Sequence, residues 1–292
     1  GETPEQALQP ESLKARIDAQ LQSIGFGDRP WQMDWASVYS ARAMTLPDYV
    51  NGHVLYCGDA AHMLPIFGVR GANTGWQDGQ NLAWKLAALI QGKAGPALLH
   101  SYSAERVAAA REIVAEAGKS TRFMTPPTRG FRLLRDATLS LALQHDFVRP
   151  LLHWRTSRPH EYTQSPLNSV GDDSALFTEG PPPGAVMRSV KLGPDQYLLD
   201  RPVTRFTLLW FGNQAVPADL QAVADDWGRR GLGLDIVPLP DHAGAGQAWL
   251  RYGVTQAGAA YLVRPDQHVC ARWIAPAPDR LDAALRAALA QR

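Results

Sequence analysis

Apolar side chains recur at helical intervals near the start of the chain. The pattern predicts a helix over residues 8–25, one face of which carries Leu8, Leu13, Ile17, Leu21 and Ile24. Residues 31–46, with the large side chains Trp35, Val38 and Tyr39, predict a strand and a turn. The chain is therefore expected to open with a helix that leads into an extended segment.

A short apolar run comes next and ends at a glycine. Residues 53–57, His-Val-Leu-Tyr-Cys, are typical of a buried strand, and Gly58 and Asp59 follow it directly. Further glycines allow the backbone to approach a ligand closely, and they lie at Gly68, Gly71 and Gly75. This order predicts a strand followed by a glycine-rich loop.

A helix is predicted from about Trp76 onward. Thr74 and Gln77 fit a capping box at its start, which would point free N–H groups and the positive end of the helix dipole at the glycine-rich loop. Such a place suits an electron-rich or anionic group. The core positions expected from helical spacing are Trp76, Leu82, Leu86, Leu89 and Ile90.

The remaining chain divides into helices, a linker and a second α/β pattern. Helices are predicted over residues 98–124 and about 130–155, whereas the Pro-, Ser-, Asp- and Gly-rich residues 156–185 predict a surface linker. The tail then predicts a strand, a helix, a strand, a hairpin around Arg264–Gln267 and a closing helix, over 206–211, 217–230, 234–239, 259–273 and 281–289. Strand, helix, strand, hairpin, helix is the thioredoxin order.

Composition narrows the class of protein. A chain of 292 residues is long enough for two domains, and 45% hydrophobic with 20% charged residues is ordinary for a globular protein. A net charge of +1 gives no reason to expect nucleic acid or an anionic membrane as partner, and no apolar run is long enough to span a bilayer. Cys57 and Cys270 form no CxxC and no metal-ligand spacing, which favours a reduced cytoplasmic protein without a metal.

Residues 58–86 carry a motif at fixed spacing. It begins Gly58-Asp59-Ala60-Ala61-His62, continues through Pro65 and the glycine-rich loop to Asn73 and Asp78, and ends in residues 81–86, Asn-Leu-Ala-Trp-Lys-Leu. This segment resembles the second flavin-contacting motif of the FAD-dependent aromatic hydroxylases, the group of p-hydroxybenzoate hydroxylase and phenol hydroxylase. The Tyr-x-x-Glu-Arg pattern of Tyr102, Glu105 and Arg106 resembles the next helix of that family.

The resemblance implies an α/β fold class: the C-terminal part of a FAD/substrate domain of the p-hydroxybenzoate hydroxylase type, followed by a thioredoxin-like domain. The implied divisions are 1–160, a linker over 161–185, and a tail over 186–292 similar to that of the phenol-hydroxylase branch, which has lost its redox cysteines. Gln267 stands where that branch usually has glycine. The family's N-terminal Gly-x-Gly-x-x-Gly fold is not found, so we expect the missing FAD-binding part as a partner. Homodimer contacts are expected from the helices before residue 160.

The resemblance also implies roles for particular residues. Asp59 would accept a hydrogen bond from the FAD ribitol, and Gly68, Gly71, Ala72 and Asn73 would line the cofactor, the last three at the flavin pyrimidine edge. Pro65 would lie beside the aromatic substrate. The alternatives are an Asp59 that caps its own turn and a Pro65 that only stiffens the loop.

Four further residues are expected to have structural roles more than chemical ones. An arginine in an open loop, such as Arg70, is more often a solvated charge than a flavin contact. His62 titrates near neutrality, but the resemblance implies a positioned structural histidine. Asp78 and Lys85 are expected to fix the helix against its neighbours. No catalytic residue is assigned.

The reaction implied is the hydroxylation of a phenolic ring with NAD(P)H and O2, through a flavin C4a-hydroperoxide. One rival is a related flavoprotein that performs epoxidation or Baeyer–Villiger insertion. Another is a non-catalytic scaffold or interaction fragment that does not hold FAD by itself, and the isolated chain is expected to be inactive. The substrate, the ring position, the NADH or NADPH preference and the phenol-activating base are not readable from these residues.

Overall fold

The computed structural model describes residues 3–40, 42–66, 70–152, 159–169, 171–177, 179–201, 204–241 and 246–291. The chain divides into two compact units, residues 1–42 and residues 43–292. Each unit is described by itself.

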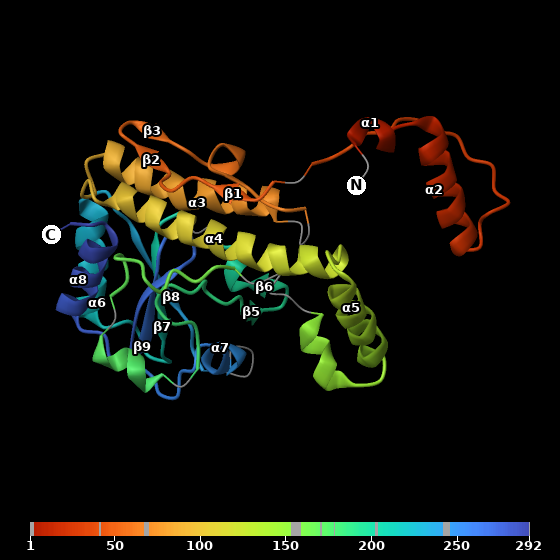
Figure 1. Cartoon of the computed structure of the whole chain (residues 1–292). Helices are drawn as coiled ribbons and strands as arrows, with labels where there is room; N and C mark the ends of the chain where they lie inside the picture. Colours follow the sequence, from red (N-terminus) through yellow and green to blue (C-terminus); the bar gives the residue numbers. More distant parts are fainter. Residues whose placement is uncertain are drawn as a thin grey trace. The chain divides into compact units, whose positions relative to one another are not determined.

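The first unit contains two helices, α1 (Pro4–Ala7) and α2 (Pro10–Ser23), in place of the single helix predicted over 8–25 (Figure 1). The strand predicted over residues 31–46 is wrong. Among the described residues of that range only Met44–Thr45 (β1) is a strand, while Trp35 is 73% and Tyr39 68% exposed. A strand needs a neighbour to satisfy its N–H and C=O groups, and the described residues 31–40 have no ladder partner.

Short strands open the second unit. β1 pairs with β4 (His62–Met63), and β2 (Val50–Asn51) pairs with β3 (Val54–Leu55), both antiparallel. The buried strand predicted over 53–57 is therefore wrong: only two of its residues are in β3, and Val54 is 53% exposed. The chain then turns through a 3-10 helix, η1 (Gly58–Ala60).

Helix α3 (Gly71–Ile90) begins a turn and a half earlier than predicted, and its N-cap residue, Arg70, does not cap the helix through its side chain. The predicted capping box is wrong, because Thr74 lies inside the helix and is buried. The predicted core is wrong at its ends too, since Trp76 is 78% and Ile90 76% exposed. The buried face is mainly polar and consists of Thr74, Asp78, Asn81, Lys85 and Ala88.

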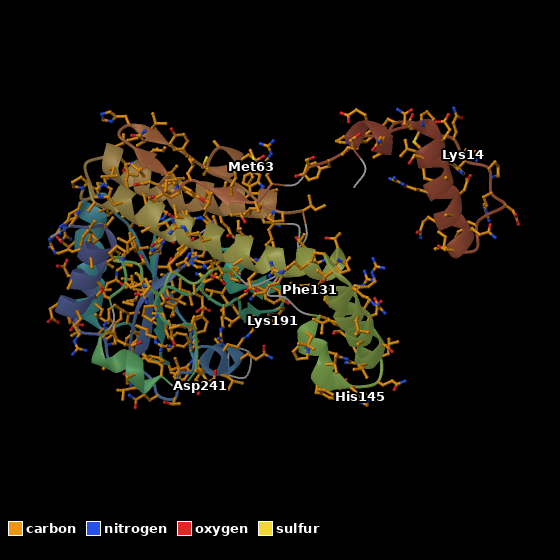
Figure 2. The ribbon with its side chains drawn as sticks, viewed as in Figure 1. Lys14, Met63, Phe131, His145, Lys191 and Asp241 are labelled. Carbon is orange, nitrogen blue, oxygen red and sulfur yellow. The ribbon has the colours of Figure 1, made fainter. Side chains whose placement is uncertain are left out.

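Helix α4 (Leu98–Met124) has the predicted bounds and packs along α3 (Figure 1). After it come α5 (Arg129–Ala142) and a 3-10 turn, η2 (Asp146–Leu151). Figure 2 labels Phe131 on α5 and His145 just before η2. Many apolar side chains of this region are exposed, namely Phe131, Leu133, Leu134, Leu139, Leu141, Leu143, Phe147 and Leu151.

The tail forms a four-stranded sheet in the order β10-β9-β7-β8. β7 (Phe206–Phe211) runs parallel to β8 (Leu234–Pro238) and antiparallel to β9 (Ala259–Val263), which forms a hairpin with β10 (Val269–Trp273). Helices α6 (Ala218–Arg229) and α8 (Pro278–Ala288) share a core with one face of the sheet, and α7 (Gly246–Arg251), which was not predicted, shares a core with the other. The element order predicted from the sequence is otherwise present.

The sheet does not have a separate core on its α6 and α8 side. Ala88 of α3 and Leu98 of α4 belong to the same buried cluster as Leu208 and Trp227, and Trp84 meets Phe206 edge-on at 5.7 Å between ring centroids. Hydrophobic burial thus runs continuously from the helix pair into the sheet.

The segment predicted as a surface linker is largely tied to the sheet edge. Tyr162, Leu167 and Phe177 are buried, and the Ser169 N–H donates to the Cys270 carbonyl at 2.7 Å. The Gly184 N–H donates to the Val269 carbonyl, also at 2.7 Å. The segment continues through η3 (Asp172–Leu176), β5 (Lys191–Gly193), β6 (Gln196–Tyr197) and η4 (Leu198–Asp200). It therefore covers the edge strand β10.

The turn of the β9–β10 hairpin explains why glycine suits position 267. The Arg264 N–H donates to the His268 carbonyl at 2.8 Å and the Gln267 N–H to the Arg264 carbonyl at 2.9 Å. Gln267 has φ of 65°, the left-handed conformation that the last residue of such a three-residue loop adopts. A side chain there costs about 1–2 kcal/mol relative to a right-handed conformation.

We expect Gln267→Gly to raise the free energy of unfolding by about 0.5–1 kcal/mol, because relief of this strain exceeds the backbone entropy that glycine loses on folding. Denaturant unfolding measures the difference. Gln267→Ala is the control, since it retains Cβ and hence the strain. Equal stability of the Gly and Ala variants would contradict the expectation.

Candidate functional site

The site begins where the loop at Gly58 meets helix α3. Gly58 has φ of +57°, and a Cβ added to Gly75 would lie 3.4 Å from the Gly58 Cα, so the two backbones approach closely. The Gly58 N–H donates to Asp78 Oδ2 at 3.0 Å. The turn that carries Asp59 is thereby held against the second turn of α3.

Asp78 is the buried centre of this arrangement. Its Oδ2 also lies 2.7 Å from His62 Nε2, and its Oδ1 accepts from Arg106 Nε at 2.6 Å. Burial by itself would raise the pKa of Asp78, but the hydrogen bond from His62 and the charge of Arg106 outweigh it and hold that pKa below its usual value. The carboxylate therefore stays charged and joins β4, η1 and α4.

Arg106 extends the contacts in two directions. Its Nη2 donates to the Thr74 carbonyl in α3 at 3.2 Å, and its Nη1 donates to the Tyr162 hydroxyl at 2.8 Å. Burial would lower the pKa of Arg106, yet the neighbouring Tyr162 and Asp78 raise it above the usual value. Burial raises the pKa of Tyr162 to about 12, so its hydroxyl is neutral at ordinary pH.

The predicted cofactor residues that the structure describes lie in η1 and in α3, which Asp78 holds together. Asp59 is exposed, and its carboxylate makes no hydrogen bond among the residues that the structure describes. Gly71 is half-buried while Ala72 and Asn73 are exposed, all in the first turn of α3. Nothing in these contacts makes Asp59 a cap of its own turn.

The structure describes three of the four remaining residues singled out from the sequence. Pro65 is buried just after β4, and Gly68 lies outside the described residues. Arg70 is the half-buried N-cap of α3. His62 is buried against Asp78, as a positioned residue would be.

A second polar cluster lies further along the same helix pair. Glu105 is fully surrounded: Arg264 donates to both of its oxygens, at 2.6 and 3.0 Å, and Lys85 Nζ donates to Oε2 at 2.7 Å. Asn81 Nδ2 donates to Glu105 at 2.7 Å and to Asp266 at 3.1 Å. We call Asn81, Lys85, Glu105, Arg264 and Asp266 the seam cluster, because it joins α3 and α4 to the β9–β10 turn.

The charges of the seam cluster compensate each other. Burial would raise the pKa of Glu105, but Arg264 and Lys85 outweigh it and hold that pKa far below its usual value. Burial would likewise raise the pKa of Asp266, and Arg264 and His268 keep it well below normal. Burial lowers the pKa of Lys85 to about 8. Arg264 remains charged, because Asp266 and Glu105 outweigh the effect of burial.

Sequence reasoning expected Lys85 to fix the helix against its neighbours, but it missed the rest of the seam cluster. Arg264 and Asp266 were assigned only to a turn, and their partners lie 159 to 185 residues away. One signal was present: Thr74, Asp78, Asn81 and Lys85 are polar residues at helical spacing, which is how a buried polar face is encoded.

We also searched the described residues for a metal site, a membrane-spanning helix and a ligand cavity. The described residues contain no group of three or more His, Cys, Asp or Glu side chains placed to hold a metal ion, and none of their helices has the length and apolarity to cross a membrane. A cavity of about 350 Å³ lies by Trp84, Arg205 and Gly231, away from the predicted cofactor residues.

Residues 1–117 match the family model described as "FAD binding domain". Among curated proteins, the tetracenomycin A2 monooxygenase-dioxygenase of Streptomyces glaucescens is 38% identical over 145 residues, which cover 45% of this chain and 24% of that protein. A 3-(3-hydroxy-phenyl)propionate/3-hydroxycinnamic acid hydroxylase of Mycolicibacterium smegmatis is 36% identical over 137 residues, covering 46% of this chain and 23% of that one. The chain thus spans about a quarter of the length of these relatives.

Solved structures agree in fold. The flavin-dependent monooxygenase PieE, in complex with FAD and substrate, matches with a TM-score of 0.74 at 24% identity, over 100% of this chain and 57% of that one. Aklavinone-11 hydroxylase, in complex with FAD and aklavinone, matches with a TM-score of 0.71 at 26% identity, over 100% of this chain and 53% of that one. The predicted resemblance is confirmed: the chain is similar to FAD-dependent aromatic hydroxylases in sequence and shares the fold of flavin-dependent monooxygenases, whereas the thioredoxin-like tail stays a prediction.

We expect Glu105→Gln to lower the free energy of unfolding at pH 7 by about 3–5 kcal/mol, because it leaves buried cations without their counter-charge. A lowered folded pKa contributes stability above the unfolded value, 4.5, and that stability is lost as the pH falls toward the folded pKa. The gap between wild type and variant should therefore narrow below that pH, by about 1.4 kcal/mol per pH unit. Denaturant unfolding across pH 3–7 measures it.

Glu116→Gln is the matched control on the same helix. Glu116 pairs at 2.6 Å with Lys119, whose side chain is 44% exposed, so its loss should cost only about 0–1 kcal/mol. A Glu105→Gln penalty that is the same at every pH would show that charge pairing is not its cause.

Proposed function

We propose that this chain supplies the ribitol and pyrimidine side of the FAD site in a monooxygenase that hydroxylates a phenolic ring with NAD(P)H and O2. One observation carries the proposal: Asp78 holds the turn of Asp59, which has no partner among the described residues, against the helix whose first turn is Gly71–Asn73. A free carboxylate and a helix N-terminus are what a hydroxyl-bearing cofactor with an electron-rich ring requires.

The residues fit FAD in chemical type. Asp59 would accept hydrogen bonds from ribitol hydroxyls. Gly71 and Ala72 have little or no side chain to cover the backbone, so the N–H groups of the first helical turn, with Asn73, would face the flavin pyrimidine edge. The helix dipole there contributes about 0.3–2 kcal/mol toward negative charge on the ring. When bound, FAD would supply the hydride and oxygen chemistry.

The substrate is proposed to be a small aromatic compound. Support comes from the names of relatives, which are hydroxylases of hydroxyphenylpropionate and of aklavinone. Pro65 is proposed to lie beside that compound, and its burial next to β4 is consistent with a wall of the site. Gly68 is proposed as a cofactor contact on the motif alone.

We also propose that the active enzyme includes a further FAD-binding part, which would make the isolated chain inactive. The chain's coverage of 53% and 57% of the solved relatives supports this. We further propose that the chain divides into residues 1–160, 161–185 and 186–292. The last of these is proposed to be a thioredoxin-like domain, because its sheet order fits that fold. Free Cys57 and Cys270 fit a reducing compartment such as the cytoplasm.

The tail is proposed to have no redox role. Cys270 is fully buried in β10, and burial raises the pKa of its thiol to about 12, so little thiolate forms. Homodimer formation is also proposed, and the exposed apolar side chains of α5 and η2 support it.

A non-catalytic scaffold is the second candidate function. It is favoured only by the extent of buried ion pairing, which a purely structural module would also use. Asp59 speaks against a scaffold, because it is exposed and has no partner in the described part of the chain, and a scaffold does not require a carboxylate held in that position.

We expect Asp59→Ala in the complete gene product to weaken FAD binding about ten- to a hundredfold, because it removes a charge-assisted hydrogen bond worth about 1.5–3 kcal/mol. The melting temperature of the FAD-free protein should change little, since Asp59 makes no protein hydrogen bond among the described residues. Fluorescence titration and thermal unfolding give the two quantities.

Asp48→Ala is the control, because Asp48 accepts hydrogen bonds from the Val50 N–H at 2.9 Å and from Ser103. It should lower the melting temperature and leave FAD affinity nearly unchanged. If Asp59→Ala behaves in that way instead, Asp59 is a turn residue and the proposed function is wrong.

A further inference from the structure

Tyr162 lies where the sheet, the connecting segment and the helix pair meet. It is 4% exposed, and its backbone N–H donates to the Gly184 carbonyl at 2.8 Å. Its ring stacks on His268 of the β9–β10 turn, with 4.2 Å between centroids and 28° between planes. Its hydroxyl is one of the acceptors of Arg106.

The turn behind Tyr162 is itself fixed. His268 Nδ1 lies 2.9 Å from the Asp266 carbonyl, and Arg264 Nε donates to Asp266 Oδ1 at 3.0 Å. Arg264 in turn donates hydrogen bonds to both carboxylate oxygens of Glu105 on α4. The stacking surface offered to Tyr162 is therefore anchored to the same helix that carries Arg106.

A planar guanidinium is oriented by its partners taken together. Arg106 donates through Nε to Asp78, through Nη2 to the Thr74 carbonyl and through Nη1 to Tyr162. Because the five N–H groups form a rigid fork, holding Nη1 also sets the direction of Nε. Asp78, so held, keeps its other oxygen on the Gly58 N–H.

We infer that Tyr162 is a positioning residue for the cofactor loop: it transmits the fixed geometry of the tail's β9–β10 turn through Arg106 and Asp78 to Gly58 and Asp59. The tail thus acts on the cofactor site without any chemistry of its own. The effect on FAD rests on the proposed function, whereas the effect on the loop does not.

The test uses Tyr162→Phe in the complete gene product, which removes the acceptor hydroxyl and keeps the stacked ring. Amide hydrogen exchange without FAD should become about tenfold faster in peptides covering residues 56–63, since a hydrogen bond to a charged group is lost next to the loop. Exchange in β7 and β9 should stay as in wild type. FAD affinity should fall about tenfold, because fewer molecules hold the loop in its binding geometry.

Tyr252→Phe is the matched control. Tyr252 is a fully buried tyrosine of the tail, and among the described residues its hydroxyl bonds to the backbone of Arg188 alone, at 2.7 and 3.0 Å. It should lower overall stability without selective exchange at residues 56–63. His268→Ala, which removes the ring behind Tyr162, is the second variant and should reproduce the local effect even if Tyr162→Phe folds poorly.

A double variant distinguishes an effect of Tyr162 that passes through Asp78 from a general loss of stability. If Tyr162 acts through Asp78, Tyr162→Phe should add little to the exchange and FAD defects of Asp78→Asn. Full additivity would overturn the inference, as would unchanged exchange at residues 56–63 or a uniform rise like that of Tyr252→Phe. Faster local exchange with unchanged FAD affinity would support the positioning role and contradict the proposed function of Asp59.

Discussion

A charge buried in a protein interior has to be paired, and this constraint organises the larger unit of the chain. Glu105 and Arg106 are neighbours on α4, yet each belongs to a different cluster. Arg106 pairs with Asp78, and Glu105 pairs with Lys85 and Arg264. Removing one partner of such a pair is costly, whereas replacing a whole pair by apolar residues is often neutral. The clusters therefore specify how α3, α4 and the sheet fit together more than they add net stability.

The tail is joined to α3 and α4 by more than a linker. Its sheet shares a hydrophobic core with α3 and α4, and Arg264 and Asp266 reach the helix pair through fully buried side chains. A domain attached only by a linker would be free to move by default. Here the continuity of core and charge makes the tail part of the framework behind the candidate cofactor site.

Two aspartates of the same motif have different roles, which their surroundings determine. Asp78 is buried, and every contact it makes is to the protein, where it holds a histidine, an arginine and a backbone N–H. Asp59 lies on the turn that Asp78 holds and is exposed without a hydrogen-bond partner in the described chain. One carboxylate stabilises the shape of the site, and the other is left available to a ligand.

The sequence by itself determined the elements that depend on local interactions. The bounds of α4, the order of the tail elements and the turn at Arg264–Gln267 follow from periodicity and turn chemistry, and the motif led to the resemblance to FAD-dependent aromatic hydroxylases. The strand over 31–46 and the buried strand at 53–57 were wrong, because an apolar run does not show whether a partner strand or a covering core will be present. The core of α3 was wrong because apolar periodicity does not register polar residues that are buried by pairing. Asn81 finds Asp266 across 185 residues. Only the tertiary structure decides such partners, since the free energy of a buried charge depends on what folding brings within hydrogen-bonding distance of it.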